Sequence, residues 1–241
     1  MAFMVFTRYN VLMDIVWLLL TMIIIVTYIG MGALSFINGG LSKKTIIYTL
    51  MMIAGAVWTI SVHTMTTTEP DNILISVPIN WVCIVIIYAM MLLFSLTFLH
   101  IEKKAWYRLV AVILVALVTQ ILIQLLLPDG KRFVYIEGAD GVWSYYAIIL
   151  SPMTVLLILY IVAHAATSIV VLARARKQAE TELGRKLISG VLIGSCVLVA
   201  LNFIFNLIIT DLDLHRIDTL FVVLTAMPFY RAVIKHGDDD L

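Results

Sequence analysis

Charged residues are scarce in this sequence. Lys, Arg, Asp and Glu make up 13% of its 241 residues, whereas hydrophobic residues make up 63%. A chain of this composition has too little polar surface for a soluble domain of its size. The net charge of only +1 also offers no footing for nucleic acid, whose binding proteins are typically strongly basic. We therefore expect one membrane domain over residues 1–241, in contact with the lipid bilayer and with no nucleic acid.

Cysteine and the motifs of catalysis are equally scarce. The two cysteines, Cys83 and Cys196, fall inside apolar runs and are typical of small buried hydrophobes, so no disulfide framework is expected. The last apolar run has no His-x-x-x-His motif for zinc, and its one lysine, Lys235, lies at its end rather than where retinal would be attached. No phosphate-binding loop or HExxH motif is present. We expect no enzyme, no metal and no cofactor.

Long apolar runs are what the sequence has in abundance. Seven of them reach or approach the ~20 residues that cross the hydrocarbon of a bilayer as a helix. Their approximate ranges are 10–36, 45–66, 73–99, 105–127, 145–173, 186–210 and 217–235. Most connections are short, which predicts neighbours packed antiparallel. The expected fold is an all-α integral membrane bundle of seven transmembrane helices.

The few charges are distributed unevenly along the chain. Basic residues concentrate in the gaps after the first, third and fifth runs and in the tail, whereas the other connections are mainly acidic. The basic set is Lys43, Lys44, Lys103, Lys104, Arg108, Arg174, Arg176, Lys177, Arg185, Lys186, Arg231 and Lys235. Because cytoplasmic loops retain Lys and Arg, the pattern predicts an external N-terminus and a cytoplasmic C-terminus.

The longest outer connection, between the fourth and fifth runs, has its own chemistry. Residues 132–136 and 142–146 are rich in aromatic and β-branched residues, and Gly138-Ala-Asp-Gly141 between them is typical of a turn. The pattern predicts a short β-hairpin over residues 132–146. A lone hairpin is marginal in water, so we expect it to cover the outer mouth of the bundle, with an interfacial aromatic belt as the alternative.

Polar residues within the runs gather in the outer half. The carboxamides of Gln120 and Gln124, and those of Asn202 and Asn206, are spaced four residues apart and share a helix face. Because an unpaired polar group facing lipid is costly, these faces should point into the bundle. The alternative is interhelical hydrogen bonding of about 0.6 kcal/mol each. The expected ligand-binding residues are His63, Asn80, Trp81, Gln120, Gln124, Asn202, Asn206 and Asp218.

The layout resembles the seven-helix sensory module at the N-terminus of many prokaryotic histidine kinases, LuxN-like proteins among them. The resemblance lies in Phe98-Leu-His100 before a basic turn, in the β-like outer segment 128–144, and in Asp211-Leu-Asp213 with Asp218 ahead of a proline-bearing last helix. It implies a receptor-like sensor in the prokaryotic cytoplasmic membrane that binds a small amphipathic ligand in an outward-facing cavity. Family members usually continue into a kinase or another output domain.

The resemblance leaves the output of the chain open, since the sequence stops at Leu241. Either it is truncated before an output domain, or it signals through a partner protein; Gly190-x-x-x-Gly194 has the small-residue spacing of a possible homodimer. The rival interpretation is a structural or transport subunit of a larger membrane complex. A minor alternative is a b-type haem protein ligated by His100 and His164.

Overall fold

The computed structural model describes residues 2–67, 70–99, 104–123, 134–136, 145–147, 152–203 and 212–235. Within them it has seven α-helices, one short 3-10 helix and two strands. In chain order these are α1 (Ala2–Gly39), α2 (Lys43–Thr67), α3 (Pro70–Leu96), η1 (Thr97–Leu99), α4 (Lys104–Ile123), β1 (Val134–Ile136), β2 (Tyr145–Ala147), α5 (Pro152–Gln178), α6 (Glu182–Phe203) and α7 (Leu212–Lys235).

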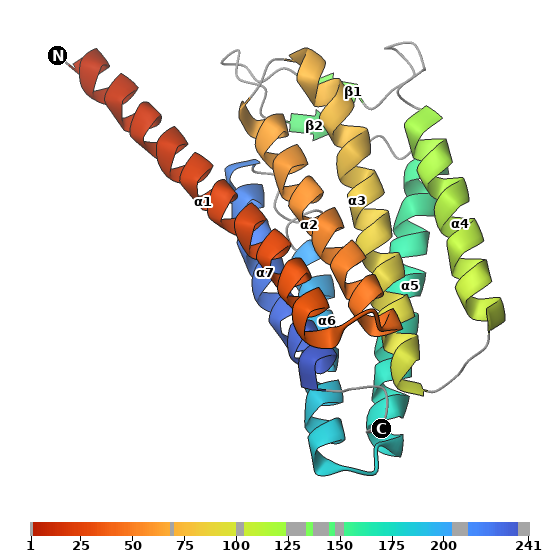
Figure 1. Ribbon diagram of the computed structural model, residues 1–241. Helices are drawn as coiled ribbons and strands as arrows, with labels where there is room; N and C mark the ends of the chain where they lie inside the picture. The colour runs from red at the N-terminus through yellow and green to blue at the C-terminus, as the bar shows by residue number, and fades with distance from the viewer. Residues whose placement is uncertain are drawn as a thin grey trace.

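The helices alternate in direction along one bundle axis (Figure 1). The α1–α2 turn, η1, the α5–α6 turn and the last residues of α7 lie at one end, which we call the basic end because Lys43, Lys44, Arg176 and Lys235 lie there. The first residues of α1 and both strands lie at the opposite end, which we call the outer end. The alternation agrees with the antiparallel packing expected from short connections.

The α1–α2 turn shows how local sequence fixes this alternation. Gly40 adopts φ +60°, a left-handed conformation that glycine tolerates without steric cost. Its amide donates to the Phe36 carbonyl at 3.1 Å, closing the end of α1. The Ser42 hydroxyl then accepts the Thr45 amide at 3.1 Å and caps the start of α2. A helix stop and a helix start therefore lie within four residues, so α2 must fold back along α1.

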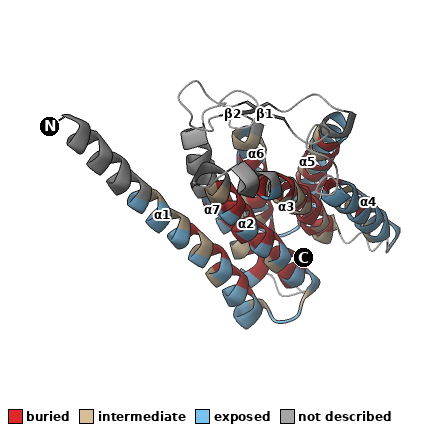
Figure 2. Cartoon of the chain, turned by 90° about the horizontal axis from the view of Figure 1, so that it is seen from above, coloured by how far each residue is buried: buried red, intermediate tan, exposed pale blue. Residues whose placement is uncertain are grey.

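Burial is concentrated on α2, α3 and α7 (Figure 2). In the membrane-crossing part of α3, 78% of the residues are buried, against 11% in α4 and 22% in α1. The largest fully buried side chains include Tyr28, Tyr48, Phe94 and Phe229, contributed by α1, α2, α3 and α7. The core therefore lies around α3, with α1 and α4 at its edges.

Helix α4 packs through a single stripe. Val110, Ile113, Leu117 and Ile121 recur at helical spacing and form the buried or half-buried side of the helix. The rest of α4 is apolar but exposed, including Val112 and Val115. In a bilayer such faces are covered by lipid tails, so their exposure costs nothing there.

Predicted boundaries are wrong at the starts of the fifth and sixth runs. The fifth run was expected to be helical from residue 145, but Tyr145–Ala147 is strand β2 and α5 begins at Pro152. Tyr145 and Tyr146 favour extended backbone, and proline is favoured in the first turn of a helix, where no N–H is needed. Helix α6 likewise begins at Glu182 rather than near 186, because the Thr181 hydroxyl caps the Gly184 amide at 3.0 Å.

The strands pair antiparallel, with Val134 opposite Ala147, Tyr135 opposite Tyr146 and Ile136 opposite Tyr145. Each has three residues, shorter than the two stretches expected from the sequence. The turn residues 137–144 lie outside the described residues. The hairpin over 132–146 and its position as a cover for the outer mouth therefore stay predictions.

Six helices are long and apolar enough to cross a membrane, judged on the described residues. They are residues 15–39, 43–64, 75–99, 105–123, 155–178 and 182–202. The side chains of α7 are described only from Val223 onward, which leaves its outer half untested. The chain is thus a multi-pass membrane protein.

Candidate functional site

Two polar contacts tie α1, α2 and α3 together near the outer end. The Ser61 hydroxyl of α2 donates to the Ser76 carbonyl of α3 at 2.6 Å. Two residues further along α2, His63 Nδ1 lies 3.4 Å from Thr21 Oγ1 of α1. The Thr21 hydroxyl donates to the Trp17 carbonyl at 2.8 Å, so the His63 contact is satisfied when Nδ1 carries the proton and donates.

Asn80 and Trp81 of α3 are half-buried, and Trp81 has different surroundings from His63. Trp81 packs against a small apolar cluster between α3, α4 and α5, which consists of Val85, Ile121, Leu157 and Tyr160. It also borders the main core. Trp81 therefore belongs to the α3–α5 interface, while His63 belongs to the α1–α2 interface.

The expectation that Gln120 faces the bundle interior is wrong. Its side chain is exposed on α4, next to Ile121, which is buried in the α3–α4–α5 cluster. Consecutive residues on a helix point about 100° apart. The apolar stripe that ends at Ile121 decides which side of α4 packs inward, and it turns Gln120 outward. Its partner at the four-residue spacing, Gln124, lies outside the described residues, so the shared face stays a prediction, and the inward direction is contradicted at Gln120.

The remaining expected residues are only partly described. Asn202 is half-buried near the end of α6. Asp218 lies on the described backbone of α7, without a described side chain, and Gln124 and Asn206 lie outside the described residues. Gathering of all these residues around one outward-opening space is thus not seen, and it is contradicted at Gln120.

A small internal cavity lies deeper than the polar residues, and on the same helices. On four helices, an expected site residue lies nearer the outer end than a residue that lines the cavity. The two are separated by four to eight residues, which is roughly 6–12 Å along the helix axis at 1.5 Å per residue. The pairs are His63 and Gly55, Asn80 and Ile87, Asn202 and Leu198, and Asp218 and Thr225. The sequence therefore places a polar level above an apolar one on α2, α3, α6 and α7.

Residues 15–240 match the family described as the N-terminal 7TM region of histidine kinase. The chain belongs to this family. The match covers all seven helices apart from the first residues of α1, and it confirms the resemblance expected from the sequence. A comparison with curated proteins found no match.

The buried histidine of this 7TM family member, His164 of α5, is one of the two expected ligands of the haem alternative. His164 of α5 lies against the Tyr160 ring, with ring centroids 3.8 Å apart, and its Nδ1 lies 3.0 Å from the Tyr160 carbonyl. One ring nitrogen and one ring face are thus engaged within α5. The His164 Nε2 is buried without a hydrogen-bond partner among the described residues. His100, the other expected haem ligand, lies outside the described residues, so the haem alternative stays untested.

The glycine spacing on α6 is used inside the bundle of this sensor module. A Cβ added at Gly190 would lie 3.7 Å from Pro228 Cβ of α7. One added at Gly194 would lie 3.1 Å from the Thr225 carbonyl oxygen and 3.4 Å from Pro228 Cγ. Gly190-x-x-x-Gly194 therefore lets α6 and α7 approach each other, and it does not present a surface to a second copy of the chain.

Sequence reasoning missed the buried tyrosines. Tyr28 and Tyr48 are fully buried, and the Tyr28 ring occupies space that a side chain at Gly55 would fill, since an added Cβ would lie 2.8 Å from Tyr28 Cε1. Tyrosine in a membrane protein is usually assigned to the interface. The signal that could have found Tyr28 is Gly55 itself, a glycine in the middle of an apolar helix.

Proposed function

We propose that this chain is the membrane sensor module of a prokaryotic histidine kinase system and that it carries out no chemical reaction of its own. The observation that carries the proposal is the family match over residues 15–240. The family is defined by its place at the N-terminus of histidine kinases, where a membrane region has the task of converting an external condition into a change at the cytoplasmic side.

The orientation follows from the distribution of charge. Lys43, Arg176, Lys177, Arg185 and Lys235 all belong to the basic end of the bundle. Because basic residues are retained in the cytoplasm, this end faces the cytoplasm and the N-terminus lies outside. The basic end is then the surface from which a kinase or another output partner receives the signal.

We place the ligand at the outer end, above the apolar core. The polar groups of His63, Asn80 and Asn202 lie there, and the contacts of Thr21 and Ser61 show that polar groups are tolerated between these helices. An amphipathic ligand would direct its polar head to this level and its apolar body toward the core. The segment 132–146 would cover the entrance from outside.

Signalling requires two helix arrangements that the ligand binds with different affinity. A small ligand at the outer end can shift the population of a bundle in which helices move by about 1–2 Å. The basic turns would then present a different surface to the output partner. No covalent step is needed for this function.

Ligand binding can be tested with the full chain in lipid nanodiscs. The probes are acyl lactones and fatty acids of graded chain length, and the readout is the shift in the midpoint of thermal unfolding. We expect a concentration-dependent rise for part of the series, weakened at least tenfold in apparent affinity by Asn80→Leu. Gln120→Leu is the matched control, because Gln120 faces away from the bundle. Equal loss in both variants would contradict the site.

One observation favours the rival function of a structural or transport subunit. The apolar faces of α4 and of α1 are exposed in the isolated chain, and neighbouring subunits could cover them as well as lipid. A native-mass measurement of the complex extracted from its own membrane separates the two functions. A monomer, a homodimer or a complex with a kinase supports the sensor. Fixed stoichiometry with several unrelated membrane subunits supports the rival.

A further inference from the structure

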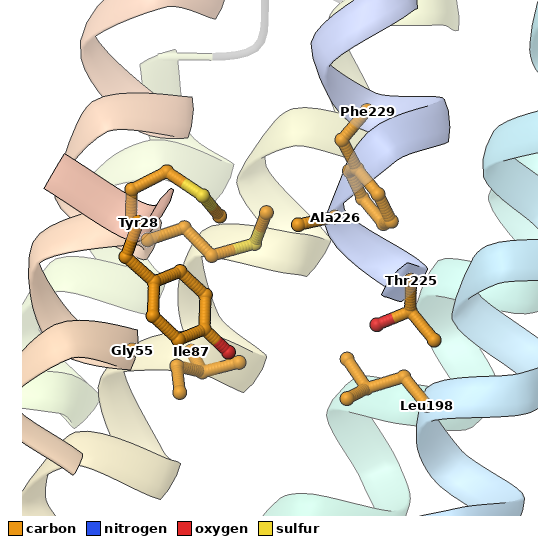
Figure 3. Close-up of a pocket in the computed structure, with 9 residues that line it drawn as sticks. Tyr28, Gly55, Ile87, Leu198, Thr225, Ala226 and Phe229 are labelled. Atoms are coloured by element: carbon orange, nitrogen blue, oxygen red, sulfur yellow. The ribbon is translucent and has the colours of Figure 1, made fainter. Parts of the chain in front are cut away.

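The internal cavity has a volume of about 10 Å³ and lies between α1, α2, α3, α6 and α7 (Figure 3). Its lining consists of Tyr28, Met51, Met52, Gly55, Ile87, Leu198, Thr225, Ala226 and Phe229. This is the space of about one water molecule, and a mostly apolar lining leaves such a void dry. The cavity is therefore too small to be the ligand site. What it supplies is free space beside α7.

Helix α7 carries a proline at the level of the cavity. Pro228 lies inside the helix, next to the lining residues Thr225, Ala226 and Phe229. Proline lacks the N–H that would bond to the carbonyl four residues earlier, and its ring crowds that carbonyl, which permits a bend. A proline and a void at the same level give the helix both a hinge and room to use it.

The side of α6 that packs against α7 has glycines in place of larger side chains. Gly190 and Gly194 both face Pro228, within 3.7 Å of it once a Cβ is added. Contacts of this kind hold two backbones close together without interlocking side chains. Packed helices with larger residues between them can move only by repacking those residues. The α6–α7 contact therefore permits small movements of α7 along or around its axis.

Tyr48 of α2 contacts α7 on both sides of Pro228. The Tyr48 hydroxyl donates to the Ala226 carbonyl at 3.4 Å and lies 3.6 Å from Met31 Sδ of α1. Its ring centroid is 6.2 Å from that of Tyr230. A donor–acceptor distance of 3.4 Å is long for a hydrogen bond, so the contact holds α7 weakly and can be broken at small cost.

A row of ring contacts leads from this point to the basic end. Phe229 of α7 lies 5.3 Å from Phe94 of α3, centroid to centroid, and Phe94 lies 5.5 Å from Phe98 of η1. The Lys44 ammonium lies 5.7 Å from the Phe98 ring, within the range of a cation–π contact. A displacement of Phe229 therefore reaches a buried lysine at the basic end through two intervening rings.

We propose that the segment of α7 from Thr225 to Tyr230 is the moving part of the sensor, and that Tyr48 is the positioning residue that holds it in the resting arrangement. The cavity provides the space into which the segment turns. The ring row then carries the displacement to Lys44 and the basic turns. This inference rests on the proposed function for its biological meaning, since it names how the output side of the sensor is regulated.

The test measures the position of α7 without any ligand. Spin labels are attached to Lys235→Cys at the end of α7 and Arg176→Cys at the end of α5, both exposed, in a Cys196→Ser background. The full chain is placed in lipid nanodiscs, and the distance distribution is measured by pulsed electron resonance. The original sequence should give one narrow distribution. Tyr48→Phe keeps the ring and removes the hydroxyl, and it should shift or broaden the distribution by about 1–2 Å or more.

The matched control is Tyr160→Phe. Tyr160 is also a buried tyrosine, and its hydroxyl has no partner among the described residues, so its removal should leave the distribution unchanged. A second label pair, Leu41→Cys with Arg176→Cys, does not involve α7 and should be unchanged in every variant. A change at this second pair would mean a loosened bundle and would overturn the assignment of Tyr48.

Filling the cavity should have the opposite effect. Leu198→Phe adds volume from α6 without altering Tyr48, so Tyr48→Phe combined with Leu198→Phe should recover the narrow distribution. The inference is overturned if Tyr48→Phe matches the original sequence, or if Tyr160→Phe shifts the distribution equally. Because no ligand or kinase takes part, these outcomes do not depend on the sensor function. A shifted distribution in a protein that binds none of the probes would count against the proposed function alone.

Discussion

Helices α3 and α4 are both apolar and both long enough to cross a membrane, yet they occupy opposite kinds of environment. In α3, 78% of the membrane-crossing residues are buried, whereas in α4 the share is 11%. Lipid tails are as apolar as a protein core, so hydrophobicity does not decide which of two helices is central. Aromatic rings that meet, such as Phe94 with Phe229, and glycines that admit them decide it instead.

The largest expected effect comes from truncating the centre of α3. Phe94→Ala removes a fully buried ring in contact with Phe98 and Phe229, and it should lower the free energy of unfolding by about 3–5 kcal/mol. Val115→Ala on the exposed side of α4 is the control, with an expected change within about 0.5 kcal/mol. Denaturant titration in lipid–detergent micelles measures both. Similar losses for the two variants would break the contrast between α3 and α4.

A smaller loss of stability is expected when a single methyl group is added to α2. Gly55→Ala would place a Cβ 2.8 Å from Tyr28 Cε1, so the ring must move, at a cost of about 1–3 kcal/mol. Gly30→Ala on α1 meets nothing within 4 Å and should keep stability or raise it by up to about 1 kcal/mol. The same denaturant titration measures the free energy of unfolding of both variants. A neutral Gly55→Ala would show that Tyr28 is loosely held.

The hydrogen bond between α2 and α3 should contribute less to the free energy of unfolding than the Phe94 ring or the packing at Gly55. Ser61→Ala removes the hydrogen bond to the Ser76 carbonyl, and interhelical hydrogen bonds in membranes contribute about 0.6 kcal/mol on average. Thr167→Ala is the control, because its exposed hydroxyl bonds to the Ala163 carbonyl of its own helix. A loss above about 2 kcal/mol at Ser61 alone would mean that polar contacts, rather than rings, hold α2 to α3.

The smallest effect is expected at Gln120. Because this side chain is exposed on α4, Gln120→Leu should change the free energy of unfolding by less than about 0.5 kcal/mol and should leave ligand affinity unaltered. Calorimetric unfolding with and without the best probe measures both quantities. A clear loss of affinity would return Gln120 to the ligand site and would bring the exposed side of α4 into function.

The sequence predicted the seven helices, but it did not predict the direction of the Gln120 side chain. Seven apolar runs and the charges between them were sufficient for the antiparallel bundle and the family. The position of Gln120 could not be predicted from carboxamide spacing, because Ile121 beside it packs inward and both faces of α4 satisfy a bilayer. Tyr48 gave no sign of its role, since its contacts to Met31 and Ala226 depend on the helix packing and not on any local pattern.

The proposed sensor function depends on which end of the bundle faces the cytoplasm, and cysteine labelling can determine this orientation. In sealed cells, a reagent that does not cross membranes is applied to chains carrying Asp140→Cys or Lys177→Cys in a Cys196→Ser background. We expect modification at position 140 and none at position 177 until the membrane is opened. Modification at position 177 in intact cells would reverse the orientation and contradict a sensor that receives its ligand outside and delivers its signal at the basic end.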